Sequence, residues 1–241
     1  MIRQTWLLYR HYVRITARSR FALAFNLAQP MFYLALFGPV FATFGAWETL
    51  VPGLVVQLAL LSSGLAGFGI VFDQRGGVLD RLRVTPASRL ALLLGRVLDN
   101  TTALLAQSVL LVAAGYAFGL RAWPPGVLLS LVLVAALGMS LAALSYAAAL
   151  TLNEQLFAPV MTTAVVPLML LSGTFLPMSM APDWLAALSW FSPFRHVLEA
   201  MRELFAGTLV STTVVVGVAV VAGLAVAGLW AGTRVFNREN A

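Results

Sequence analysis

The sequence predicts an all-α polytopic membrane protein with six transmembrane helices, and three observations lead to this fold class. The 241-residue chain is 61% hydrophobic and only 10% charged, whereas soluble globular domains are roughly 45–50% apolar and about 25% charged. A surface of this composition requires lipid as its main solvent. Six apolar segments are long enough to cross a bilayer, and the arginines are unequally shared among their connections. The segments do not alternate in polarity, which excludes a β-barrel.

Each apolar segment has about 20 or more residues, which at about 1.5 Å per residue cross a hydrocarbon core of about 30 Å. We expect them to form a single transmembrane domain over residues 1–241. The six predicted spans are Phe21–Phe44, Leu50–Phe72, Val97–Gly119, Gly126–Leu150, Leu156–Leu176 and Leu209–Gly232.

The arginines predict the orientation of the bundle. Five precede the first span, five lie between the second and third, and two follow the last. Only Arg121, Arg195 and Arg202 fall on the other side. Because positive charge is retained on the cytoplasmic side, both termini are expected to be cytoplasmic. The opposite face is where we expect an interfacial belt of tryptophans, made of Trp47, Trp123, Trp184 and Trp190.

The N-terminal segment, residues 1–20, has the pattern of an amphipathic helix. One apolar stripe at helical spacing contains Ile2, Trp6, Tyr9 and Val13. A neighbouring stripe, suited to anionic lipid headgroups, contains Arg3, Arg10, Arg14 and Arg18. Two interpretations stay open, namely a helix lying in the membrane interface and a positive topology signal with no other role.

The longest polar stretch is the cytoplasmic loop at residues 73–96. Residues 78–83 can form about two helical turns, with Leu79 and Leu82 on one side. Thr85 can cap a second helix that has Pro86 at its first position and continues into the third span. The short helix is either a docking element for a cytoplasmic partner or a solvated turn.

The outer segment at residues 177–208 is too apolar for an ordinary loop. Pro177, Pro182 and Pro193 divide it into pieces too short to span a membrane, and Ser192 is placed to cap a helix that starts at Pro193. A set of charges on one face of that helix comprises Arg195, Glu199 and Arg202. We expect short re-entrant helices here; the alternative is one amphipathic helix lying flat on the membrane.

The residue inventory excludes several kinds of chemistry. The chain contains no lysine, so it has no Walker A phosphate-binding lysine, and it contains no cysteine and only two histidines. No zinc ligand set, catalytic constellation or aromatic nucleic-acid platform is evident. Asp99 lies close to Arg96 in sequence and is interpreted as part of a local structural pair. We therefore expect no catalytic residue, no metal site and no nucleic-acid partner.

Two local patterns resemble a known family. Residues 72–86, FDQRGGVLDRLRVTP, are similar to an acidic, glycine- and leucine-rich loop that ends in Thr-Pro. Residues 171–177, LSGTFLP, followed by Ser192-Pro193 and by residues 199–202, EAMR, form the second pattern. With the arginine-rich N-terminal segment and six spans, the chain resembles the permease subunit of type-2 ABC exporters, which include antibiotic and multidrug exporters. The chain departs from many relatives at Asp73-Gln74, where they carry glutamate and further charge.

The resemblance implies a division of labour between subunits. Such permeases pair as homo- or heterodimers in the bacterial plasma membrane, in contact with its lipid, and bind separate ATPase subunits, which hold ATP and magnesium, so this chain itself needs no cofactor. The coupling helix that contacts the ATPase would contain Val78, Leu79, Asp80, Arg81, Leu82 and Arg83, with the N-terminal helix as a second contact. The outer gate would contain Phe175, Pro177, Pro193, Glu199 and Arg202.

The expected function is therefore export of a hydrophobic or amphipathic substrate, such as a drug, lipid or glycolipid, by a subunit that is not itself an enzyme. The alternative is an ion-coupled secondary transporter, which requires an essential carboxylate within the membrane. Asp99 is the candidate for that carboxylate. A third interpretation is a structural membrane scaffold with no transport activity.

Overall fold

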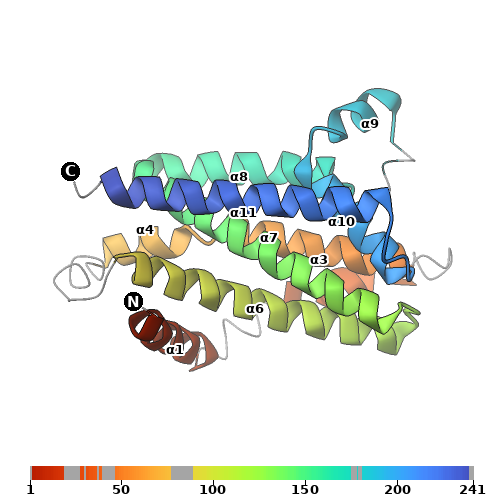
Figure 1. The fold of residues 1–241 in the computed structure, drawn as a ribbon, viewed down its shortest axis with the longest axis horizontal. Coiled ribbons are helices and arrows are strands. Elements are labelled where there is room, and N and C mark those ends of the chain that lie inside the picture. Colours follow the sequence, from red (N-terminus) through yellow and green to blue (C-terminus); the bar gives the residue numbers. More distant parts are fainter. Residues whose placement is uncertain are drawn as a thin grey trace.

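A computed structural model describes residues 2–18, 28–29, 31–36, 38–39, 47–76, 89–174, 178 and 181–238. Regular secondary structure in these ranges is helical, and Figure 1 shows the helices stacked side by side along one axis. The helices are α1 (Ile2–Arg18), α3 (Trp47–Gly64), α4 (Phe68–Arg75), α6 (Arg89–Phe118), α7 (Pro124–Thr151), α8 (Glu154–Leu171), α9 (Asp183–Ser189), α10 (Pro193–Phe205) and α11 (Thr212–Arg238).

The helix α7 occupies the centre of the bundle. It packs against α11, α6, α3, α10, α4 and α8. The helix α1 packs on α6 and is seen almost end-on in Figure 1, so it crosses the direction of the long helices. The C-terminal turns of α11 lie at the end of the bundle that carries α1 (Figure 1), whereas α9 and α10 lie toward the opposite end. We call these the α1 end and the α10 end.

Four of the six predicted spans correspond to helices that are long and apolar enough to cross a membrane. They are Trp47–Asp73, Leu90–Phe118, Pro124–Thr151 and Thr212–Gly232. The predicted fifth span contains a shorter apolar helix, Gln155–Leu171. The predicted first span falls mostly outside the described residues. The count of six and the orientation in the membrane therefore stay predictions.

The second predicted span is built from two helices rather than one. The chain turns between the end of α3 at Gly64 and the start of α4 at Phe68. At Gly67 a Cβ atom would lie 2.5 Å from both the Ser145 carbonyl oxygen and the Phe157 ring. The Gly67 N–H donates to Ser145 Oγ at 2.9 Å. The missing side chain thus allows this turn to pass directly against α7 and α8.

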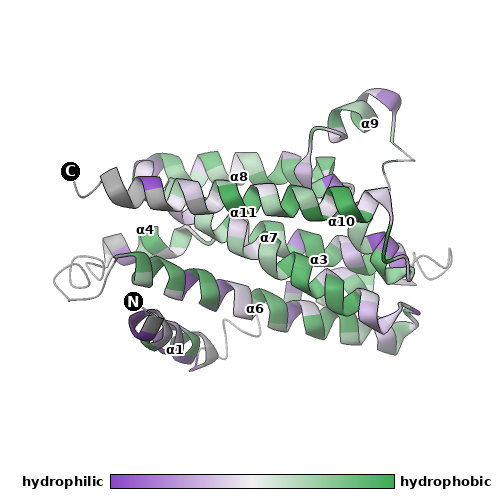
Figure 2. Ribbon diagram, in the orientation of Figure 1, coloured by the Kyte–Doolittle hydropathy of each residue, from purple (hydrophilic) through white to green (hydrophobic). Residues whose placement is uncertain are grey.

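The core divides into two apolar clusters. The larger one joins α3, α6, α7, α10 and α11, and residues 50–60 of α3 are all buried. The smaller one, toward the α1 end, joins α4, α6 and α7 with Phe157 of α8. Figure 2 shows that hydrophobic residues also cover outward-facing parts of the long helices. Leu128, Val132 and Val226 are among the large apolar side chains that are more than half exposed, as expected where lipid is the solvent.

The outer segment forms two short helices, which agrees with the predicted division by prolines. Pro193 is the first residue of α10 and Ser192 is its cap position, although the Ser192 side chain makes no capping hydrogen bond. The segment is therefore not one continuous helix, and the orientation of α10 relative to the membrane stays a prediction. This helix packs against α3, α7, α8 and α11 and buries much of its apolar face.

Candidate functional site

At the α1 end, Arg96 of α6 joins three helices. Its guanidinium forms an ion pair with Asp73 of α4. Its Nε donates to the Tyr12 hydroxyl of α1 at 3.3 Å, and the guanidinium carbon lies 5.1 Å from the centre of the Tyr12 ring. The Arg96 side chain is only 11% exposed, and the Asp73 side chain 30%. A cation this deeply buried requires partners, and Asp73 and Tyr12 supply them.

The helix α1 is held to α6 by a series of polar contacts. The Tyr9 hydroxyl lies 3.0 Å from Thr102 Oγ1, and Thr16 Oγ1 donates to Asp99 Oδ2 at 3.2 Å. A Cβ at Gly95 of α6 would lie 3.0 Å from the Leu8 Cβ of α1, so the two helices approach closely. The helix α1 is therefore a packed part of the bundle and more than a topology signal.

The partners of two predicted residues differ from the sequence interpretation. Arg96 was expected to pair locally with Asp99, but it forms its ion pair with Asp73, while Asp99 accepts from Thr16. Tyr9 was assigned to the apolar stripe of the N-terminal helix, but its hydroxyl contacts α6. Trp6 of the same stripe is 60% exposed.

A second polar cluster fixes α3 to α6 nearby. Ser63 Oγ donates to Asn100 Oδ1 at 2.7 Å, and Asn100 Nδ2 donates to the Ser62 carbonyl oxygen at 3.3 Å. Together with the contacts of Arg96, these bonds connect α3, α4, α6 and α1. We refer to Asp73, Arg96, Tyr12, Asp99 and Thr16 as the inner network.

The inner network lies at the base of the polar loop at residues 73–96. Asp73 is in the last turns of α4, and Arg96 is in the second turn of α6. The ion pair between them ties the two ends of the loop together. The predicted coupling helix, Val78 to Arg83, lies outside the described residues, so its structure and contacts stay predictions.

At the α10 end, Arg195 connects α9 to α10. Its Nε donates to Glu199 Oε1 at 2.7 Å, one turn along α10, as the charge spacing predicted. Its Nη1 donates to the Ala186 carbonyl oxygen at 3.0 Å and also to Ser189 Oγ, both on α9. The guanidinium carbon lies 4.8 Å from the centre of the Trp190 ring. Arg195 therefore sets the position of α9 relative to α10.

Arg202 plays a different part from the one its spacing suggested. Its Nη2 donates to the Gly173 carbonyl oxygen at 2.9 Å, beyond the end of α8, and its buried Nε has no partner among the described residues. Burial lowers the pKa of Arg202 to about 10, and the nearby Glu199 opposes this shift. The side chain is thus still charged at neutral pH, and it links α10 to α8.

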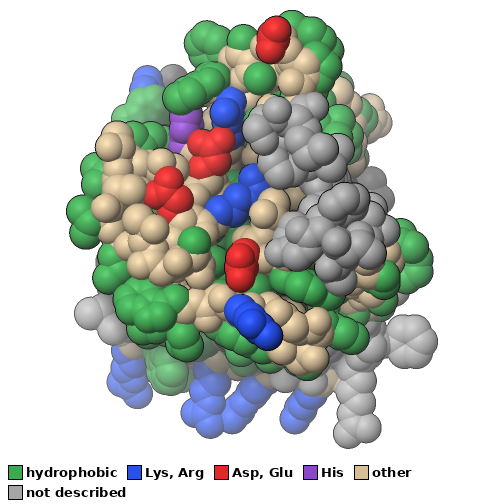
Figure 3. Space-filling view, turned by 90° about the vertical axis from the view of Figure 1, so that its right-hand side faces the viewer, with side chains coloured by type: hydrophobic (Ala, Val, Ile, Leu, Met, Phe, Trp, Pro, Cys, Tyr) green, Lys and Arg blue, Asp and Glu red, His purple; other side chains and the backbone are tan. Residues whose placement is uncertain are grey.

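The other predicted gate residues are only partly placed. Pro193 starts α10 and Glu199 pairs with Arg195, whereas Phe175 and Pro177 lie outside the described residues. Acidic and basic side chains gather on this end of the molecule, framed by hydrophobic ones (Figure 3). Within the described part of the chain, no three acidic or histidine side chains come together as a metal site would require.

Sequence reasoning missed the contacts between α1 and α6. Tyr9, Tyr12 and Thr16 recur at spacings of three and four, which is a polar stripe on one helix face. Such a stripe beside arginines could have predicted a face packed on protein. The sequence interpretation instead divided this helix between lipid and water.

Comparison with known proteins gave two matches. Residues 3–206 match the model of a family described as "ABC-2 type transporter". A protein of Cyanophora paradoxa named "Putative transport permease ycf38" is 25% identical over 200 residues, which cover 78% of this chain and 69% of that protein.

Proposed function

Because the chain belongs to the ABC-2 type transporter family, and is thus a multi-pass transport permease subunit, we propose that it forms the membrane path of an ATP-driven exporter. In this proposal a separate subunit binds ATP and magnesium and hydrolyses the ATP. Two permease copies form the path in a bacterial plasma membrane, and the cargo is a hydrophobic or amphipathic molecule.

The observation that carries the proposal is the ion pair at the base of the cytoplasmic loop. Residues 78–83 act as the coupling helix seated on the ATPase. A push on this helix reaches α4 through Asp73 and α6 through Arg96, since the two side chains are joined. It also reaches α1 through Tyr12. The loop therefore displaces several helices together, which is the kind of two-state element that ATP binding can bias.

The outer helices act as the gate in this proposal. The helix α10 is fixed to α9 through Arg195 and to the end of α8 through Arg202. It also packs against α3, α7 and α11. A relative movement of these long helices therefore changes the surface on which α10 packs, and this opens or closes the outer end of the transport path.

Co-purification in detergent tests the proposal. The permease is expressed with the ATPase encoded beside it, and the wild type is compared with a variant carrying Leu79→Arg and Leu82→Arg. We expect the wild type to retain the ATPase and the double variant to release it, because two charges interrupt the apolar side of the coupling helix. A matched control carries Ala87→Arg and Ser88→Arg, which add the same charges to the same loop outside that helix.

The control should still retain the ATPase, and all three proteins should elute as folded particles on size exclusion. If the wild type retains no ATPase even after cross-linking, the exporter proposal is wrong. If both variants release the ATPase equally, the loop is still the contact but residues 78–83 are not its centre.

A further inference from the structure

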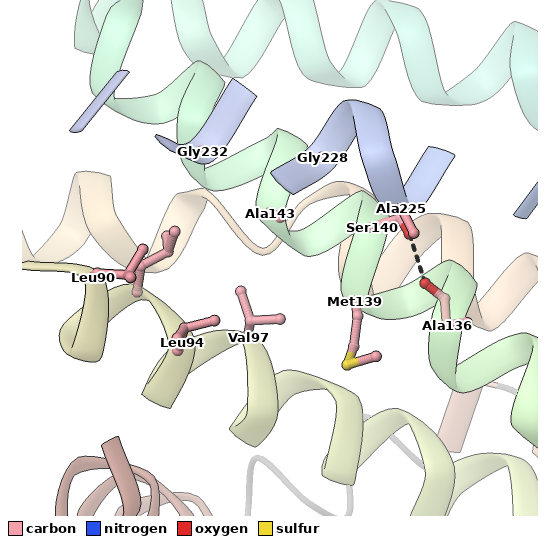
Figure 4. A pocket seen from close by; sticks show the side chains of 11 residues that line it. Leu90, Leu94, Val97, Ala136, Met139, Ser140, Ala143, Ala225, Gly228 and Gly232 are labelled. Carbon is pink, nitrogen blue, oxygen red and sulfur yellow. Dashed lines mark hydrogen bonds between the residues drawn. The ribbon is translucent and has the colours of Figure 1, made fainter. Parts of the chain in front are cut away.

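An apolar groove with a volume of about 160 Å³ lies between α6, α7 and α11 (Figure 4). Its walls are large side chains, among them Leu90, Leu94 and Val97 of α6 and Met139 of α7. Its floor consists of small residues of α7 and α11, namely Ala136, Ser140, Ala143, Ala225, Gly228 and Gly232. The small floor residues leave room that larger side chains would fill.

The groove offers no polar partner to a bound molecule. The hydroxyl of Ser140 donates to the Ala136 carbonyl oxygen of its own helix at 2.7 Å (Figure 4). A buried water needs two to four polar partners, and an apolar cavity of about 150 Å³ stays dry and binds hydrocarbon. The groove therefore fits a hydrocarbon chain better than water.

Two residues near the end of α11 indicate how far into the bilayer the groove lies. Arg234 lies over the Trp230 ring, 4.8 Å from its centre, and both side chains are exposed. Tryptophan and arginine gather at the headgroup level of membranes. The floor starts at Gly232, between these residues, and reaches Ala225, about 10 Å further into the bilayer at the helical rise. This is the depth of the acyl chains.

The groove is accessible from the surroundings of the bundle. Met139 lines it and is 39% exposed. The helices α6, α7 and α11 all contain candidate membrane spans, so the medium around them at this depth is the hydrocarbon of the bilayer.

Charges at the α1 end favour an anionic headgroup. Arg234 is exposed two residues beyond Gly232, which lines the groove. Of the acidic side chains described at this end, Asp73 is bound to Arg96 and Asp99 to Thr16. Negative charge on a ligand would therefore meet Arg234.

We propose that this groove binds one acyl chain of an anionic phospholipid from the leaflet at the α1 end. The lipid phosphate lies at the level of Arg234. The bound chain fills the space left by the small residues and completes the packing of α6 against α11. This binding is a property of the membrane-embedded chain and does not depend on the proposed export function.

Native mass spectrometry of the delipidated, detergent-purified full chain tests the inference. Phosphatidylglycerol is titrated against the wild type and Ala225→Phe, which places a ring in the groove. The matched control is Ala227→Phe, which adds the same ring to an exposed position on another side of α11. We expect the wild type and the control to bind one lipid per chain with equal affinity, and Ala225→Phe to bind at least tenfold more weakly.

Equal binding by Ala225→Phe and the wild type would overturn the inference. If Ala225→Phe does not fold, Ala143→Leu decides, since it fills the groove from α7. Phosphatidylcholine binding as tightly as phosphatidylglycerol would overturn the anionic headgroup. The chain has no cysteine, so a single Met139→Cys variant can be cross-linked at the groove alone. Efficient cross-linking between two copies in membranes would show that a second protein copy, and not lipid, covers the groove, and would overturn the inference.

Discussion

Arg96 shows how a single buried charge can organise one end of this protein. A cation inside a helical bundle is costly unless it is paired and hydrogen-bonded. Arg96 meets this requirement with a carboxylate from α4 and a hydroxyl and ring from α1. The partners come from segments 23 and 84 residues away in the chain. One side chain thereby couples the base of the loop to the N-terminal helix.

Replacing Arg96 by Met should destabilise the protein and uncouple transport from ATP hydrolysis. Hydrogen bonds to charged groups contribute about 1.5–3 kcal/mol each, and Asp73 would be left unpaired. Asp73→Asn alone should cost less, because a neutral amide can still meet Arg96. Thermal unfolding of the four proteins in a double-mutant cycle measures the interaction; we expect the double variant to lose less than the sum of the singles.

Arg10→Met serves as the control for this cycle, since Arg10 is exposed on α1; its stability should stay within about 0.5 kcal/mol of the wild type. In the assembled complex, Arg96→Met should preserve ATP hydrolysis but reduce transport. Additive losses in the cycle would mean that the ion pair contributes nothing to stability.

The sequence predicted residue types at this end better than residue partners. Apolar length located four helices that are long enough to span a membrane, but periodicity considers one helix at a time and cannot pair α1 with α6. Arg96 and Asp99 are three residues apart, so a local pair was the simplest interpretation. The structure offers Arg96 a partner on another helix instead. Spacing placed Arg202 near Glu199, but it could not predict that the hydrogen-bond acceptor of Arg202 is the backbone of Gly173.

At the scale of helices, α10 is positioned by the close approach of the backbones of α7 and α11. A Cβ at Gly126 of α7 would lie 1.8 Å from the Leu204 carbonyl oxygen, and one at Gly217 of α11 would lie 2.5 Å from the Ala200 Cβ. Glycine thus lets two long helices approach α10 with no intervening side chain. The sequence predicted where α10 begins but not this packing, because a glycine contributes nothing to an apolar pattern.

Two glycine-to-alanine substitutions on α11 distinguish the effect of α10 packing from the effect of helix propensity. Gly217→Ala should destabilise the protein by about 1–3 kcal/mol, since the added methyl group overlaps α10. Gly223→Ala should be neutral or stabilising by up to about 1 kcal/mol, because nothing lies within 4 Å of a Cβ there. Unfolding midpoints in one detergent measure both. Equal effects of the two substitutions would show that α10 does not pack on Gly217.

The helix α6 shows what polar side chains do inside a predicted span. A helix starting at Pro86 was expected to continue into the span from Val97, and the described part of α6, Arg89–Phe118, is continuous through both segments. Charged and amide side chains lie at positions 96, 99 and 100 of this helix. Each has a partner on a neighbouring helix, so the helix continues through them. Polar side chains within a helix mark contacts here rather than its end.

For the whole molecule, the two ends of the bundle carry different interactions. The α1 end ties the base of the polar loop at residues 73–96 to α1, α4 and α6, and the α10 end holds α10 against α8 and α9. The long helices α7 and α11 pack together and connect these ends. A displacement imposed at one end can therefore reach the other through packed helices, which is what an externally powered permease requires.

Ion-coupled transport makes a different demand on the whole molecule, because it needs a carboxylate that binds and releases the coupling ion. Asp99 is the candidate, but it accepts a hydrogen bond from Thr16 and so holds α1 on α6.

An asparagine oxygen at position 99 can accept the same hydrogen bond from Thr16. We therefore expect Asp99→Asn to keep its fold and at least half of the wild-type uphill transport in inverted vesicles supplied with ATP. Asp99→Leu, which has no acceptor, should lower the unfolding midpoint and loosen α1. Transport by the wild type and Asp99→Asn should also persist when ionophores collapse the ion gradients. Loss of uphill transport in a folded Asp99→Asn protein, together with sensitivity of the wild type to ionophores, would instead establish ion coupling and remove the ATPase from the energy path.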